Sequence, residues 1–127
     1  MKTIKVPIFT EEYKVVVAIG TVEELAKYVS NYAAGWNYED AWIKCSETRG
    51  ACWNTLPARH PLITLNGDLS WDLALATLPH EACHAVASIM DHLGIRDDNG
   101  GEFLAHGISA VMRHCLKHIP SHKKHKS

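Results

Sequence analysis

Six consecutive residues near the middle of the chain could bind a metal ion and activate water. Residues 79–84 read Pro-His-Glu-Ala-Cys-His within an apolar stretch that favours a helix. On a helix the side chains of His80 and His84 stand one above the other, so that two imidazoles can bind the same metal ion. Glu81 lies next along the turn, where it can accept a proton from a water molecule on that metal. The pattern predicts a Zn²⁺ site on His80 and His84, hydrolysis as the chemistry, and Glu81 as the general base.

A third ligand should come from the following helix, because catalytic zinc sites usually combine three protein ligands with one open position. An apolar helical pattern runs from Glu102 to about Ile119, and the backbone amides of a helix start stabilise a carboxylate. We therefore expect Glu102 to complete the metal site. His106, one turn later on the same face, is an alternative ligand, as are Asp97 and Asp98 in the preceding turn. His106 could instead stabilise the oxyanion of a tetrahedral intermediate or hold Glu102 in place.

Length and composition indicate one globular domain. The chain has 127 residues, of which 46% are hydrophobic and 21% charged, and its net charge of −1 gives no general attraction to nucleic acids or membranes. The N-terminus lacks the apolar region of a signal peptide, and the longest apolar run, Val15–Ile19, is too short for a bilayer. We expect a cytoplasmic protein with a single domain over residues 1–119 and a basic, disordered tail over residues 120–127.

The four cysteines do not predict a zinc site or a disulfide framework of their own. They stand at positions 45, 52, 83 and 115, without the short pairs of structural zinc sites. Cys45 and Cys52 could form a bridge only if the chain were exported. Cys83 lies between the glutamate and the second histidine of the motif, on another side of the helix, where we expect a small core residue.

The elements before residue 36 are expected to be two strands and a helix. Ile4–Phe9 contains a proline, which suits an edge strand, whereas the valine-rich segment Tyr13–Ile19 is typical of a buried strand. Thr21 and Glu24 match a capping box, which predicts a helix that extends towards Gly35.

Residues 36–60 are aromatic-rich at first and have weak periodicity. We expect a loop there, followed by a strand around Gly50–Leu56. A further strand, Leu62–Leu65, should end at the turn residues Asn66 and Gly67.

The motif helix should begin after Asp68 or Ser70 and end at Leu93, because Gly94 is a typical helix stop. Pro79 interrupts this segment. A proline inside a helix removes one backbone hydrogen bond and destabilises the helix by about 3 kcal/mol. Either the helix bends at Pro79, or a new helix begins there. Both arrangements leave the two motif histidines on one face.

The motif helix, followed after a short turn by a helix that begins Glu102-Phe103-Leu104-Ala105, resembles the zincin metallopeptidases whose third ligand is a glutamate. The chain is most similar to the compact zincin-like proteins of phages and prophages, and more distantly to the IrrE-type and SprT-like peptidases. The resemblance covers residues 60–118 and includes the strand Leu62–Leu65. In such enzymes an edge strand lines the cleft and pairs with an extended peptide substrate.

This resemblance implies a role for each matching residue. His80, His84 and Glu102 would bind zinc, and Glu81 would be the general base. The last helix carries no tyrosine that could stabilise an oxyanion, so His106 is the residue proposed for that catalytic role.

Motif, elements and resemblance together predict an α+β fold that is zincin-like. A small mixed or antiparallel sheet would lie on one side, against an N-terminal helix, the HExxH helix and a C-terminal helix. The leading function is a zinc-dependent metallopeptidase-like hydrolase acting on a peptide or protein. The alternative is a catalytically inactive zincin-fold protein whose zinc is structural and which binds a host or phage protein through the aromatic segment 36–53. Only the basic tail favours nucleic acid, and its few charges make that partner the weakest of the three.

Overall fold

A computed structural model describes residues 1–96 and 101–119 of the chain. The alternative ligands Asp97 and Asp98 and the predicted tail 120–127 lie outside these residues. In chain order the elements are β1 (Lys2–Ile8), β2 (Thr10–Gly20), α1 (Val22–Tyr32), α2 (Tyr38–Glu47), β3 (Gly50–Trp53), β4 (Leu62–Asn66), α3 (Trp71–Leu93), α4 (Glu102–Cys115) and the 3-10 helix η1 (Leu116–His118).

The four strands form one mixed sheet in the order β1-β2-β4-β3. β1 is antiparallel to β2, β2 is parallel to β4, and β3 is antiparallel to β4. The α+β class and the small mixed sheet are therefore as expected. β1 and β3 are the edges of this sheet, and the proline that predicted an edge strand, Pro7, lies in β1.

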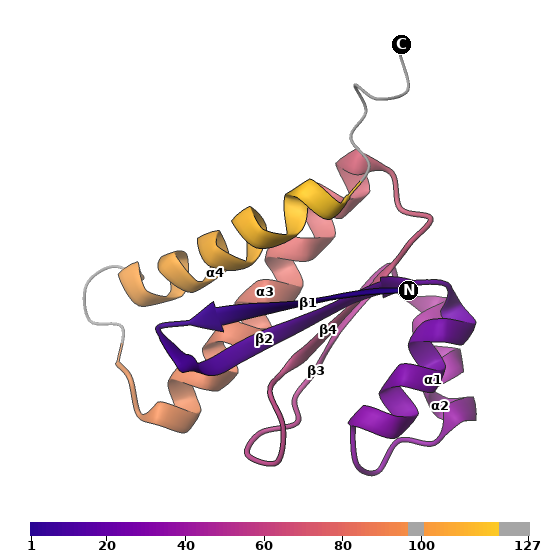
Figure 1. Ribbon diagram of the computed structural model, residues 1–127, viewed down its shortest axis with the longest axis horizontal. Coiled ribbons are helices and arrows are strands. Elements are labelled where there is room, and N and C mark those ends of the chain that lie inside the picture. Colours follow the sequence, from indigo (N-terminus) through magenta and orange to yellow (C-terminus); the bar gives the residue numbers. More distant parts are fainter. Residues whose placement is uncertain (97–100, 120–127) are drawn as a thin grey trace.

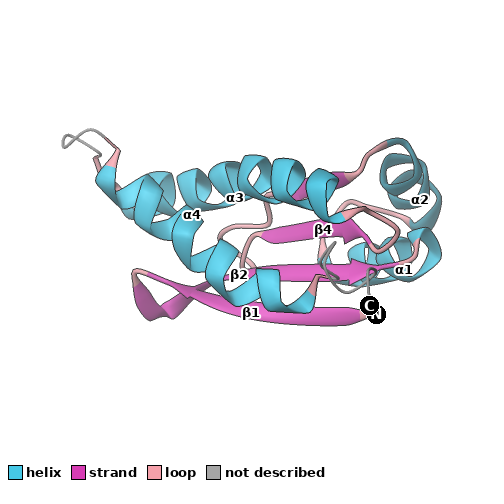
Figure 2. Cartoon of the chain, turned by 90° about the horizontal axis from the view of Figure 1, so that it is seen from above, coloured by secondary structure: helices cyan, strands magenta, loops and turns pink. Residues whose placement is uncertain are grey.

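Helices cover both faces of the sheet, which corrects the expectation of a sheet lying to one side of all the helices (Figures 1 and 2). Successive residues of β2 point to opposite faces. Val15 and Val17 belong to the core beneath α3 and α4, whereas Val16 and Ala18 belong to a second core beneath α1 and α2. Because β2 is buried on both sides, it is a continuous valine run rather than an alternating pattern.

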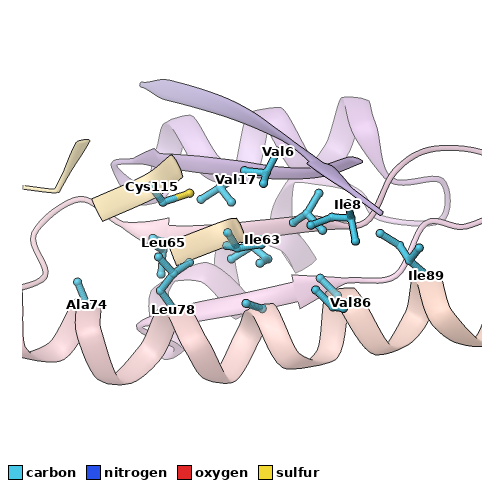
Figure 3. Close-up of a cluster of buried hydrophobic side chains, with 14 of the residues drawn as sticks. Val6, Ile8, Val17, Ile63, Leu65, Ala74, Leu78, Val86, Ile89 and Cys115 are labelled. Carbon is cyan, nitrogen blue, oxygen red and sulfur yellow. The ribbon is translucent and has the colours of Figure 1, made fainter. Parts of the chain in front are cut away.

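The larger core fixes the position of the motif helix. Figure 3 shows the inner face of α3 against the sheet, with Leu78 beside Leu65, Ile89 near Ile8, and Val86 and Ile63 between these ends of the core. These side chains are all buried. Since the motif histidines belong to the same helix, this packing determines which way they point.

α1 begins with the predicted capping box. The Glu24 backbone N–H donates to the Thr21 hydroxyl over 3.2 Å, and the Thr21 backbone N–H donates to the Glu24 carboxylate over 3.0 Å. The N-terminal ammonium donates to the same carboxylate over 3.0 Å, and these hydrogen bonds lower the pKa of Glu24, the one from the Thr21 backbone most of all. The helix ends at Tyr32, three residues before the predicted stop at Gly35.

Replacing Thr21 by alanine should lower the free energy of unfolding by about 1 kcal/mol, because an N-cap hydroxyl of this kind contributes about that much. Urea denaturation followed by circular dichroism would measure the change. Thr21→Ser keeps the capping oxygen and should stay close to wild type. Equal losses in both variants would show that the hydroxyl is not what stabilises the helix start.

α2 occupies a segment that we expected to be a loop, so that expectation is wrong. Its apolar residues are not gathered on one face, since Ala41 and Cys45 are buried while Trp42 and Ile43 are exposed. The helical periodicity of hydrophobic residues in this segment is therefore weak, and a prediction from periodicity alone misses the helix. The local signal is the N-cap Asn37, whose side chain accepts from the Asp40 backbone N–H over 2.8 Å.

α3 is one continuous helix that passes through Pro79. Of the two proposed N-caps, Ser70 is used, and its side chain accepts from the Leu73 backbone N–H over 3.3 Å. Gly94 ends the helix with a positive φ of 68°, a conformation that glycine adopts at little cost. No helix formed by residues 1–96 and 101–119 is long and apolar enough to cross a membrane.

α4 begins at Glu102, as predicted, and crosses the sheet beside α3 in the opposite direction (Figure 1). The two helices approach each other closely where Gly107 meets Val86. A Cβ added to Gly107 would lie 2.9 Å from Val86 Cγ2 and closer still to its Cγ1. Glycine is required at this point for the helices to pack as they do.

Candidate metal centre

His80 and His84 lie on the outer side of α3 with their rings close together. Their Nε2 atoms are 3.3 Å apart, and the ring planes are inclined at 81°. Both side chains are exposed, so an ion could reach them from solvent. The i, i+4 spacing thus does in the structure what the sequence pattern predicts: it brings two imidazole nitrogens to one point.

The separation of these nitrogens suits zinc. Two nitrogen ligands at the usual zinc distance in a tetrahedral site stand about 3.3–3.4 Å apart. The Nε2 atoms of His80 and His84 match this separation. Imidazole is also among the ligands that zinc prefers. The pair could therefore supply two of the corners of a zinc site.

Glu81 lies beside the pair but points into the protein. Its Oε2 atom is 3.9 Å from His80 Nε2, and its side chain is 13% exposed, compared with 69% for His80. The next residue along the helix, Ala82, is fully buried in the core under α3. Glu81 therefore lies between the exposed face and the buried face of α3, where a carboxylate can serve as a proton acceptor next to the metal ligands.

A hollow of about 410 Å³ opens beside these residues, between α3 and the edge strand β3. We call it the α3–β3 hollow; its lining comprises Lys44, Thr48, Gly50, Ala51, Cys52, Asn54, Glu81, His84 and Ser88. A second hollow shares Asn54, His84 and Ser88 with it and extends past them towards His92. Together the two hollows form a groove alongside His84.

The free edge of β3 faces the α3–β3 hollow. Arg49 accepts a backbone hydrogen bond from Asn66 over 3.0 Å. Bonded and non-bonded residues alternate along an antiparallel pair, so Ala51 also bonds to β4, while the backbone groups of Gly50 and Cys52 point outward. The edge strand that lines the hollow is β3, whereas the strand included in the zincin resemblance, β4, is internal.

Cys52 lies in the hollow as a neutral thiol. Burial, and secondarily the charge of Glu81, raise its pKa to about 12, although the charge of Lys44 opposes this effect. The thiolate is the reactive form of cysteine, so this raised pKa disfavours Cys52 as a nucleophile. The four cysteines are free, as expected for a chain without disulfides.

The structure does not bring Glu102 to the histidine pair. α4 runs antiparallel to α3, and its contact with Val86 is made by Gly107. Glu102 lies five residues before Gly107, about 7.5 Å along the helix, and therefore beside the last turns of α3. His80 lies in the opposite direction from Val86. The register of the two helices thus separates the carboxylate from both imidazoles.

His106 is also apart from the pair. It lines a separate hollow with Ile8 and Phe9, at the β1 edge of the sheet, whereas His84 lines the α3–β3 hollow at the other edge. Within residues 1–96 and 101–119, no group of three or more His, Cys, Asp or Glu side chains could hold a metal ion. The described residues bring together His80, Glu81 and His84, and the third ligand stays a prediction.

Of the lining of the α3–β3 hollow, the sequence motif predicts only Glu81 and His84 as site residues, and the ionisable side chains that it misses there are Lys44 and Cys52. Lys44 belongs to α2, the helix that periodicity missed, and Cys52 was considered only as half of a disulfide. The capping signal at Asn37 predicts the helix, but nothing in the sequence places that helix beside the motif.

Comparison of the chain with protein-family models, with curated proteins and with solved structures finds no match.

Proposed function

We propose that the chain is a zinc-dependent hydrolase of the zincin type that cleaves peptide bonds. The observation that carries the proposal is the 3.3 Å separation of His80 Nε2 and His84 Nε2, a spacing that suits one zinc ion. Two further features support it. Glu81 is within 3.9 Å of His80 Nε2, and the free edge of β3 faces the same hollow.

Each part of the site has a task in this proposal. Bound zinc would supply Lewis-acid chemistry, polarising a carbonyl group and making water more acidic. Glu81 would accept the proton of the attacking water and return it to the leaving amine. The outward backbone groups of Gly50 and Cys52 would pair with an extended peptide and hold its scissile bond near α3.

Zinc binding tests the proposal directly. His80→Ala and His84→Ala should each weaken zinc binding about a hundredfold, since loss of a residue that only hydrogen-bonds to a metal ligand already weakens binding by ten to a hundredfold. Elemental analysis and titration against a chelator would measure this. His92→Ala, an exposed histidine on the same helix, is the matched control and should bind zinc like wild type. Absence of zinc from the wild type, even after the metal is added, would refute the proposal.

The same titration decides the third ligand. Glu102 is the residue proposed from the sequence, and it lies beside the last turns of α3. Loss of zinc in Glu102→Ala would establish a site of two histidines and one glutamate, and would require α4 to sit differently when metal is bound. Retention in Glu102→Ala with loss in His106→Ala would assign the ligand to His106. Retention of zinc in both variants would mean that the third ligand is neither Glu102 nor His106.

The alternative function is an interaction module with a structural zinc ion. It is favoured by three exposed hydrophobic side chains on α2, since Tyr38, Trp42 and Ile43 are 44%, 39% and 49% exposed, and neighbouring exposed apolar residues often mark a contact surface. The two functions differ in their dependence on Glu81. A structural site has no need of the carboxylate as a base, whereas a hydrolase loses its activity without it.

A further inference from the structure

Lys44 reaches the α3–β3 hollow from the side opposite the motif helix. It belongs to α2, which packs on the other face of the sheet from α3. Its side chain nevertheless lines the same hollow as Glu81 and His84. The free edge of β3 is therefore flanked by a cation on one side and by the motif residues on the other.

Two tryptophan rings hold the ammonium group in place. Lys44 Nζ lies 5.3 Å from the ring centre of Trp36 and 4.6 Å from that of Trp53, distances at which a cation is attracted to the ring face. The rings meet edge to face at 4.7 Å. Trp53 is fixed in turn, because its Nε1–H donates to the buried hydroxyl of Thr64 over 3.0 Å. The side chain of a lysine is flexible, and an ammonium group that packs against two tryptophan rings is more restricted in position than one in open solvent.

Within residues 1–96 and 101–119, the Lys44 ammonium group has no carboxylate at ion-pair distance. In this part of the chain, which the structure describes, the carboxylates within ion-pair distance of a nitrogen are those of Glu24, beside the N-terminal ammonium group, and Glu81, beside His80. An ammonium group has three donors and no acceptor. A cation that is held against apolar rings in the lining of a hollow, and that pairs with no anion in the described part of the chain, is suited to bind an anionic group of a ligand.

We propose that Lys44 recognises a carboxylate of the peptide that lies along β3. The proposal rests on the proposed function, because it takes the hollow to be the peptide site. On an added strand the side chains alternate between the two faces. Those on the α3 face meet His84 and Glu81, and those on the α2 face meet Lys44. The substrate is thus a peptide that carries an acidic side chain or its terminal carboxylate at that position.

Peptide capture would test this without relying on turnover. The proteins are zinc-loaded Glu81→Gln, alone and combined with Lys44→Met or Lys44→Arg. The probes are three pools of N-acetylated hexapeptides: amidated and neutral, amidated with one glutamate, and neutral with a free C-terminal carboxylate. Bound peptides are separated by ultrafiltration and counted by mass spectrometry. Thermal unfolding of each variant reports any loss of packing against the tryptophans.

A charged pool should be captured about tenfold more than the neutral amidated pool, as one charge-assisted hydrogen bond would give. Preference for the glutamate pool identifies a side chain, and preference for the free carboxylate identifies a chain end. Lys44→Met should abolish the preference and Lys44→Arg should keep it.

Equal capture of the three pools, capture of none, or a preference that persists in Lys44→Met would overturn the inference. Failure of the proposed function would give different results. The wild-type protein would bind no zinc, or Glu81→Gln would not slow hydrolysis.

Discussion

Replacing Glu81 by glutamine should lower kcat/KM for peptide hydrolysis about a thousandfold, since a positioned general acid–base contributes 10²–10⁴-fold. The amide has nearly the same size as the carboxylate but cannot accept the proton of the attacking water. Zinc affinity should stay within about threefold of wild type, because the histidines supply the metal-binding nitrogens and are unchanged. The rate and the zinc affinity together show whether Glu81 acts as a base or as a metal ligand.

The measurement uses a mixture of unstructured peptides, with cleavage followed by mass spectrometry and zinc followed by chelator competition. Glu23→Gln makes the same chemical change on α1, away from the hollow, and should leave both rate and zinc affinity unchanged. Wild-type protein that binds zinc but cleaves nothing would favour the interaction module. A cleaving wild type whose rate is unaffected by Glu81→Gln would remove Glu81 from the mechanism.

The parts of the site that the sequence predicts are those set by local structure. An i, i+4 pair depends only on helix geometry, so the meeting of His80 and His84 follows once the segment is helical. The start of α1 at Thr21 is equally local, because its hydrogen bonds span three residues. Neither feature requires knowledge of how distant segments pack.

Lys44 shows what local patterns cannot supply. Its place in the same hollow as Glu81 depends on α2 packing against one face of the sheet while α3 packs against the other, with β3 between them. That arrangement is a property of the strand order β1-β2-β4-β3. β2 pairs with β4 in parallel, so β3, the next strand along the chain, is not its neighbour in the sheet. Such a strand order cannot be derived from the spacing of residues along the sequence alone.

The position of Glu102 depends on how α4 packs against α3. The sequence correctly predicts that α4 begins there, but its distance from the histidines is set by the register of α4 against α3. One tight contact in that register is the one between Gly107 and Val86. A glycine within an apolar helical pattern indicates a close approach only after the partner is known.

Replacing Gly107 by valine should therefore lower the free energy of unfolding by about 3 kcal/mol, at the upper end of the usual cost of overpacking. Even the first added carbon would lie 2.9 Å from Val86 Cγ2, so α4 must move away or Val86 must leave its position in the core. Urea denaturation of Gly107→Val would measure the loss. Ala105→Val places the same side chain at an exposed position of α4 and should lose only about 0.5 kcal/mol.

A double-mutant cycle identifies the contact responsible. Val86→Ala removes the two methyl groups nearest to the added carbon, so Gly107→Val should cost less in this background by about 1 kcal/mol or more. Purely additive losses would mean that the helices are not held together at this point. The register that separates Glu102 from His80 would then lack this anchor, and α4 could slide along α3 to bring the carboxylate to the metal.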